Sequence, residues 1–288
     1  LENHEPKHVE EDSRLLSQFG GDGKLLAGGH SLLPMMKLRL AAPRHLIDVG
    51  RLPDLRYIRE TDGRIEIGAL TTHFQIESSE LLHSKLPLLP EAAREVGDVQ
   101  VRNRGTLGGS LAHSDPAADW PAVILALDAE IQARGANSAR WIPAAEFFID
   151  LLSTALKDDE ILTSIRIPTQ PARSGHAYLK LHHPASGYAM VGIAVVVTLN
   201  DAGDVEQLAV GVTGIGAKAY RAAAVEDALR GKAPDATTLK GACEHAADGI
   251  EVNSDLFASA DYRRHLAKVY TRRALEKAIE RTRASASA

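Results

Sequence analysis

The chain has 288 residues, of which 44% are hydrophobic and 25% are charged, and its formal net charge is -5. This length allows one large domain or two smaller ones, and the acidic balance gives no electrostatic reason to expect nucleic acid or an anionic membrane as a partner. No apolar run approaches the roughly 20 residues that span a bilayer. The single cysteine, Cys243, excludes an internal disulfide framework and an iron–sulfur cluster held by this chain alone. We expect a cytoplasmic globular protein.

Short helices and short strands alternate in the first part of the chain. Apolar periodicity predicts helices at 9–19, 32–40, from Thr72 onward, 88–96, 119–128 and 146–152. Thr71 or Thr72 is the expected N-cap of the third of these helices. Alternation of apolar and polar residues predicts strands at 24–27, 45–49, 130–133, 138–142 and 161–167, and a hairpin at 57–69 that turns at Asp62-Gly63.

A proline-containing polar stretch from Pro168 to Ser174 interrupts this pattern and predicts a domain boundary. We place the first domain at residues 1–171 and the second at 172–288. In the second domain an antiparallel meander is expected first, with strands at 176–182, 189–199 and 205–213. Helices are expected to follow at 222–230, 238–248 and 262–281. Strands followed by helices are typical of an α+β domain.

Two glycine pairs carry the strongest chemical signal in the sequence. Ala27-Gly28-Gly29-His30-Ser31 follows the apolar Leu25-Leu26, and Thr106-Leu107-Gly108-Gly109-Ser110 repeats the same chemistry. Glycine lets backbone N–H groups turn toward a ligand without a Cβ in the way, and such a concave row of N–H groups suits a phosphate. One glycine pair alone is usually a tight turn. Two pairs flanked by serine or threonine suggest two loops that close on one diphosphate.

The stretches AGGHSLLPMMKLRLAAPRHLIDVG and RNRGTLGGSLAHSDPAADWP resemble the FAD-binding medium subunit of molybdenum hydroxylases, the family of the carbon monoxide dehydrogenase medium chain and the xanthine dehydrogenase flavin subunit. The resemblance runs from about residue 6 to about residue 278. It implies an α+β fold. A two-lobed FAD-binding domain of the vanillyl-alcohol-oxidase-like (PCMH) type would come first, followed by an α+β C-terminal domain with an antiparallel meander and helices.

The resemblance also implies a set of cofactor-binding residues and noncovalent FAD. The two glycine segments would wrap the FAD pyrophosphate through Ala27, Gly28, Gly29, His30, Ser31, Leu32, Leu33, Thr106, Gly108, Gly109 and Ser110. The other expected FAD contacts are Val101, Asp119, Leu162, Lys180 and Tyr188. Structural roles stay open for three of these residues: Asp119 as a helix N-cap, Leu162 as a core residue, and Lys180 on a solvated strand face.

Other candidate motifs are weaker. His30, His113, Asp115 and Asp119 match no mononuclear metal signature, so no metal site is expected in this chain. The G-x-G-x-x-A pattern within Gly211–Ala219 lacks a βαβ context and a following acidic residue, so we interpret it as a strand-to-helix turn. The segment His182–Tyr188 differs from the family's usual wording, which leaves the electron acceptor open.

The resemblance implies an electron-transfer role in which the flavin carries the chemistry, so no catalytic side chain is expected. A large molybdenum-cofactor subunit and a small subunit with two [2Fe–2S] clusters would be the partners, in a dimer of heterotrimers. Quinone, oxygen and NAD remain possible acceptors, and the substrate of the complex is open. Two alternatives remain: a self-sufficient FAD-dependent oxidoreductase of the same flavin fold, and a non-catalytic flavin- or nucleotide-binding assembly module.

Overall fold

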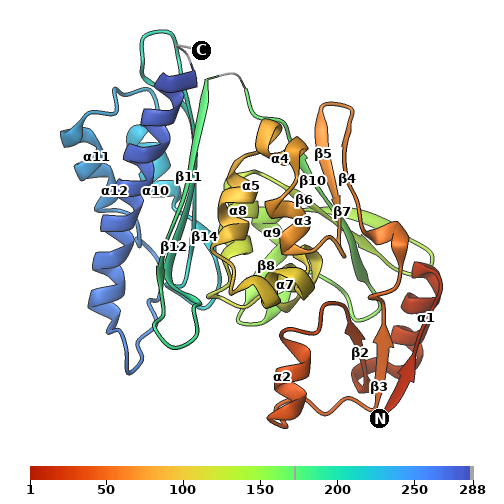
Figure 1. Ribbon diagram of the computed structural model, residues 1–288. Coiled ribbons are helices and arrows are strands. Elements are labelled where there is room, and N and C mark those ends of the chain that lie inside the picture. Colours follow the sequence, from red (N-terminus) through yellow and green to blue (C-terminus); the bar gives the residue numbers. More distant parts are fainter. Residues whose placement is uncertain (172, 286–288) are drawn as a thin grey trace.

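The N-terminal lobe is built on a small parallel sheet in the computed structural model, which describes residues 1–171 and 173–285. The strand order is β1-β3-β2, and both pairings are parallel. The strands are β1 (Glu2–His4), β2 (Gly23–Leu26) and β3 (His45–Asp48), and the helices are α1 (Val9–Phe19) and α2 (Leu32–Lys37). Helix α1 lies beside this sheet (Figure 1). It buries Val9 and Leu16 in a core that includes Ile47.

The second lobe contains an antiparallel five-stranded sheet in the order β4-β5-β10-β6-β7. Its strands are β4 (Ile58–Thr61), β5 (Arg64–Gly68), β6 (Glu130–Arg134), β7 (Ala139–Pro143) and β10 (Ile161–Pro168). Its helices are α3 (His73–Glu77), α4 (Glu80–Lys85), α5 (Leu88–Arg94), α6 (Val99–Arg104), α7 (Leu107–His113), α8 (Asp119–Ala126) and α9 (Ala144–Phe147). Two 3-10 turns and a short ribbon complete the N-terminal part: η1 (Gly20–Asp22), η2 (Pro53–Leu55), β8 (Phe148–Asp150) and β9 (Ser153–Thr154).

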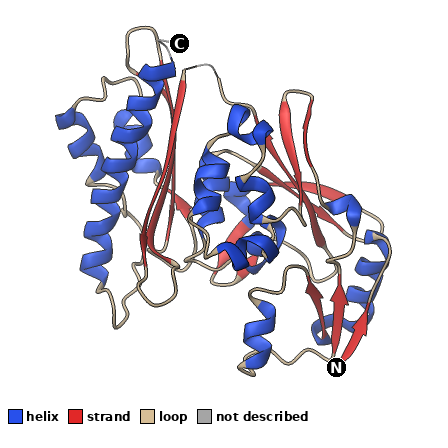
Figure 2. Ribbon diagram, in the orientation of Figure 1, coloured by secondary structure: helices blue, strands red, loops and turns tan. Residues whose placement is uncertain are grey.

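The C-terminal part is a four-stranded antiparallel sheet between two helical layers (Figure 2). Helix α8 of the second lobe packs on one face and the long helix α12 packs on the other. Strand β12, in the middle of the sheet, is therefore buried along its whole length. The elements are β11 (Ser174–His182), β12 (Ala189–Leu199), β13 (Val205–Thr213), β14 (Tyr220–Arg221), α10 (Ala223–Leu229), α11 (Ala236–Cys243) and α12 (Ala260–Ser285).

Most of the long predicted elements are present. The helix at 9–19, the hairpin and the antiparallel meander are confirmed, and the hairpin glycine has the expected positive φ of 69°. The start predicted for the second domain, residue 172, lies outside the described residues. No helix in the described ranges is long and apolar enough to cross a bilayer.

Three local predictions are wrong. The predicted helix at 146–152 is replaced by α9, which ends at Phe147, and by β8. The predicted helix at 238–248 begins earlier, because Asp235 accepts a hydrogen bond from the Thr238 N–H as its N-cap, and it ends at Cys243. The glycines around Gly214 lead from β13 to β14, not directly to a helix.

Candidate functional site

The second glycine pair is the first turn of a helix, not a loop. Helix α7 starts at Leu107, and its N-cap residue Thr106 accepts a hydrogen bond from the Gly109 N–H at 3.1 Å. The Leu107 N–H donates to the Thr71 carbonyl at 3.0 Å, and the Gly108 N–H donates to the Ala69 carbonyl at 2.9 Å. These three N–H groups therefore already have protein acceptors. The turn offers shape and the Ser110 hydroxyl to a ligand rather than free backbone donors.

The first glycine pair differs from the second in its backbone N–H groups. Among the described residues, the backbone N–H groups from Gly28 to Ser31 have no hydrogen-bond acceptor, and neither has the Ser31 hydroxyl. Gly29 has a φ of 77°, a conformation that favours glycine. Ser31 is the N-cap position of α2 but makes no capping hydrogen bond. Four adjacent unpaired donors at a partly exposed turn fit an anionic group such as a pyrophosphate.

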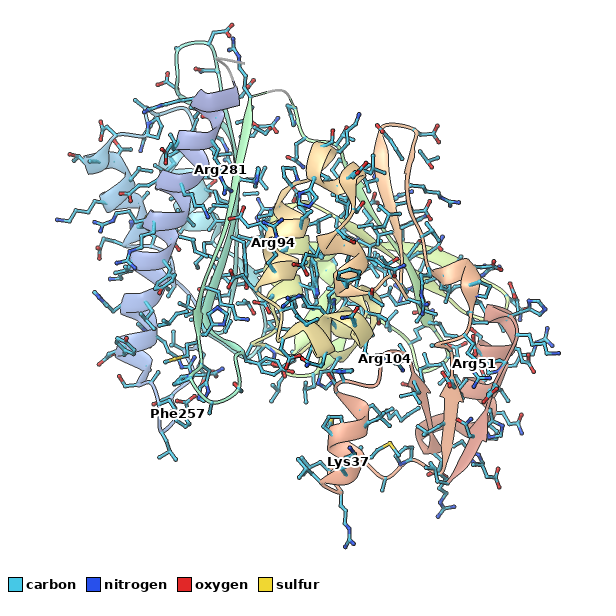
Figure 3. All side chains as sticks on the ribbon, in the orientation of Figure 1. Lys37, Arg51, Arg94, Arg104, Phe257 and Arg281 are labelled. Atoms are coloured by element: carbon cyan, nitrogen blue, oxygen red, sulfur yellow. The ribbon has the colours of Figure 1, made fainter. Side chains whose placement is uncertain are left out.

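Close backbone contact brings the two glycine segments together. A Cβ on Gly28 would lie 2.1 Å from the Arg104 carbonyl oxygen, two residues before the cap of α7. A Cβ on Gly109 would lie 2.7 Å from the Thr106 hydroxyl and 3.8 Å from the Ala27 Cβ. Figure 3 labels Arg104 where the N-terminal lobe meets the helices of the second lobe. The structure therefore places the two predicted segments beside one another, as a shared FAD pyrophosphate site requires.

A buried support beneath α7 was missed by the sequence reasoning. The Trp120 indole N–H donates to His73 Nδ1 at 3.1 Å. Burial lowers the pKa of His73 to about 3, so the imidazole is neutral. A Cβ on Gly105 would lie 2.6 Å from His73 Nε2, so this histidine sets how the chain enters the Thr106 cap. The signals available in the sequence were Gly105, directly before Thr106, and His73, directly after the Thr72 cap.

Asp119 and Lys180 are brought together, but they bind each other. The Lys180 Nζ lies 2.9 Å from Asp119 Oδ1, and the Tyr178 hydroxyl donates to the same carboxylate at 2.6 Å. The side chains of Lys180 and Asp119 are only 1% and 7% exposed. Burial raises the pKa of Asp119, while Lys180 and the hydrogen bond from Tyr178 act against that shift. This group joins α8 to β11.

Two structural alternatives for these residues are wrong. Lys180 does not lie on a solvated strand face, because α8 and the Glu95 carbonyl, an acceptor at 2.9 Å, cover it. Asp119 is not the N-cap of α8, because Ala118 holds that position.

The remaining predicted contacts lie at different depths. Leu162 is buried in the core of the second lobe, which confirms the expectation that it is a core residue. Val101 is half-buried on α6 and packs near Gly97. Tyr188 lies between β11 and β12 and is 42% exposed. Its pKa is raised by burial and by the carboxylates of Asp115 and Asp119. It lines a cavity of about 230 Å³ together with Ala117 and Arg263.

Comparison with known proteins agrees with this geometry. Residues 1–170 match the family model "FAD binding domain in molybdopterin dehydrogenase", and residues 176–278 match "CO dehydrogenase flavoprotein C-terminal domain". The chain is 41% identical to the carbon monoxide dehydrogenase medium chain of Hydrogenophaga pseudoflava, over 98% of both chains. It is 36% identical to the 6-hydroxypseudooxynicotine dehydrogenase complex subunit alpha of Paenarthrobacter nicotinovorans, over 96% of this chain and 93% of the relative.

Solved structures of related proteins are similar to this chain over 98% of its length. A chain of carbon monoxide dehydrogenase from H. pseudoflava superposes with a TM-score of 0.95 at 44% identity and 98% coverage of both chains. Quinoline 2-oxidoreductase from Pseudomonas putida 86 gives a TM-score of 0.90 at 30% identity, again with 98% coverage of both chains. The chain therefore belongs to the family of FAD-binding medium subunits of molybdenum hydroxylases, the oxidoreductase family that includes the carbon monoxide dehydrogenase medium chain.

Proposed function

We propose that this chain is the electron-transfer subunit of a molybdenum hydroxylase complex. Its noncovalently bound FAD would supply the redox chemistry, taking electrons from [2Fe–2S] clusters on a small partner subunit and passing them to an external acceptor. The observation that carries the proposal is the row of unpaired N–H groups from Gly28 to Ser31, held against the start of α7. The single cysteine supports it as well, because the clusters must then lie on another chain.

In this proposal the chain's own residues bind and orient the cofactor. The N–H groups of Gly28, Gly29, His30 and Ser31 would hold the pyrophosphate, and the Ser31 and Ser110 hydroxyls would add two donors. Thr106 and Gly108 hold the first turn of α7 in place through their hydrogen bonds within the protein. Gly109 keeps the side of that turn next to Ala27 free of a side chain.

The residues at the contact between the domains receive different proposed roles. Asp119 and Lys180 act by fixing α8 against β11, because their polar atoms are occupied by one another and by Tyr178. Tyr188 is partly exposed and close to Asp115, which suits a residue at the edge of the bound flavin. We place the boundary between the FAD-binding domain and the C-terminal domain at residues 171 and 172.

The expected partners are a large molybdenum-cofactor subunit and a small iron–sulfur subunit, assembled as a dimer of heterotrimers. Support comes from relatives that are named as medium chains or as subunits of dehydrogenase complexes. The substrate binds to the large subunit in this proposal, so this chain does not select it.

The proposal is tested with the purified chain and with the complex purified from its natural host. A visible spectrum is recorded before and after acid precipitation, and FAD is expected in the supernatant. Flavin reduction by the substrate of the complex is then followed in the presence and absence of the two partner subunits. Reduction that requires the partners supports electron transfer. Turnover by the chain alone would favour a self-sufficient oxidoreductase, and a colourless chain that takes up no added FAD would favour an assembly module.

A further inference from the structure

Glu2, His4 and His45 form a cluster at the start of the N-terminal sheet. Their donor atoms lie within 4.8 Å of one another. His4 Nε2 and His45 Nδ1 are 3.1 Å apart, and Glu2 Oε2 is 3.3 Å from His45 Nδ1 and 3.9 Å from His4 Nε2. Two imidazoles and a carboxylate are a donor set that zinc and related divalent ions prefer in proteins.

The strand register brings these three side chains to one face of the sheet. Glu2 and His4 are two residues apart on β1, so they point to the same side. Glu2 is also the register partner of His45 on the parallel strand β3. The cluster is therefore a product of the β1–β3 pairing and not of neighbouring positions in the sequence.

Packing fixes the orientation of the two imidazole rings. Phe19, at the end of α1, stacks on His45 with ring centroids 3.8 Å apart, and its centroid is 4.8 Å from that of His4. Gly23 is the register partner of His45 on β2, and a Cβ there would lie 3.0 Å from the Phe19 Cβ. The glycine thus lets Phe19 approach the histidines. The His4 and His45 side chains are only 26% and 21% exposed, whereas Glu2 is 71% exposed.

The distances suit a tetrahedral ion. Zinc–nitrogen and zinc–oxygen bonds of about 2.0–2.2 Å in tetrahedral geometry place ligand atoms roughly 3.3–3.6 Å apart. The three separations of 3.1, 3.3 and 3.9 Å scatter around this range. The longest involves Glu2, whose exposed side chain can adjust. A water molecule would complete the fourth position.

We propose that Glu2, His4 and His45 bind one borderline divalent transition-metal ion, with Zn²⁺ as the reference ion, and that this ion fastens β1 to β3. The sequence predicts no metal site, because its other histidine and aspartate candidates match no metal signature. Glu2, His4 and His45 come from two strands and form no local motif. The site is separate from the proposed FAD site. His45 is level with Gly23, and the five residues from there to Gly28 span roughly 16 Å of extended chain.

The test uses the untagged full chain with its FAD bound, after treatment with a chelator. Calorimetric titration with ZnCl₂ is expected to show one equivalent of tight binding, and added zinc should raise the thermal unfolding midpoint. Glu2→Gln, His4→Gln and His45→Gln should each weaken zinc binding by at least tenfold. Glu2 is exposed, so its substitution is expected to leave folding and flavin content unchanged even if His45→Gln disturbs the stacking on Phe19.

A matched control separates this site from other histidine–carboxylate pairs. His245 lies 2.7 Å from Asp248 in an exposed pair elsewhere on the chain, and His245→Gln should leave zinc binding unchanged. A difference spectrum with Co²⁺ should show visible d–d absorption in wild type and lose it in His4→Gln. Absence of zinc binding to wild type, or equal binding by His4→Gln and His245→Gln, would overturn the proposal. Neither outcome bears on the electron-transfer role, which is measured through the flavin.

Discussion

The two glycine pairs look alike in sequence but use their backbone donors differently. The first pair lies between β2 and α2, whereas the second lies in the first turn of α7, which follows α6. At α7, the Thr106 hydroxyl accepts a hydrogen bond from the Gly109 N–H. Two backbone carbonyls accept hydrogen bonds from the two N–H groups that precede Gly109. At α2, Ser31 makes no cap, and the preceding N–H groups have no acceptor among the described residues. A glycine pair thus marks a close backbone approach, and the cap decides whether the donors remain available to a ligand.

The largest expected effect comes from Gly28→Ala. The new Cβ would lie 2.1 Å from the Arg104 carbonyl, so the two segments must separate. We expect loss of FAD binding and a destabilisation of about 3 kcal/mol, typical of overpacking a fixed backbone. Flavin content and urea unfolding measure the two effects. Gly21→Ala is the matched control, because nothing lies within 4 Å of a Cβ there. Full flavin content in Gly28→Ala would show that the contact is not required.

Gly109→Val tests the capped pair. A Cβ at this position would meet the Thr106 hydroxyl at 2.7 Å, and the branched side chain would extend toward Ala27. We expect FAD binding to be lost while the fold remains. The control is Gly241→Val, also in a helix but with open space around the new Cβ. If Gly109→Val kept its flavin and Gly28→Ala lost it, only the uncapped segment would form the site.

The support beneath α7 predicts a pH dependence. Burial lowers the pKa of His73 to about 3, against about 6.5 in an unfolded chain. A base whose pKa is lower in the folded than in the unfolded chain does not reduce stability above about pH 6.5. As the pH falls from about 6.5 toward 3, the free energy of unfolding decreases by about 1.4 kcal/mol per pH unit. His73→Gln keeps an acceptor for Trp120 but cannot titrate, so its stability should fall less steeply with acidification.

Urea unfolding of both chains at about pH 5 and about pH 7.5 measures this slope. Burial raises the pKa of Asp12 to about 7, which acts in the opposite direction, since that group costs stability as pH rises from about 4 to about 7. The comparison of His73→Gln with wild type cancels the Asp12 contribution. Identical slopes for the two chains would contradict the assignment of a neutral, buried His73.

The smallest expected effect separates the two serines. Ser31 and Ser110 both have hydroxyls without a protein partner in the described ranges, so each can donate to the cofactor. Loss of one such hydrogen bond costs about 1 kcal/mol, or roughly fivefold in affinity. We expect Ser31→Ala and Ser110→Ala each to raise the Kd for FAD by about this factor. An unchanged Kd in one variant would remove that serine from the site.

The sequence predicted the long elements and the glycine pairs because each carries a local pattern. Helices α6 and α7 were missed, because the segment after Gly97 was interpreted as a loop around the second glycine pair. The pairing of Asp119 with Lys180 depends on contact between two domains, 61 residues apart in the chain. Lys180 alternates like a surface residue, and packing against α8 and the Glu95 carbonyl buries it. The same reasoning explains why His73 and Trp120 were not paired in advance.

In the proposed site, the contact between Gly28 and Arg104 would also set the stage of folding at which FAD can bind. Its two sides lie far apart in the chain, so it forms only after a large loop has closed, which is late in a folding process that rewards local contacts first. The strands of the N-terminal sheet end at Asp48, yet the turn that we propose to bind the pyrophosphate has no opposing wall until the chain has been synthesised past Arg104. In the proposed site, FAD uptake would therefore report the docking of the two lobes.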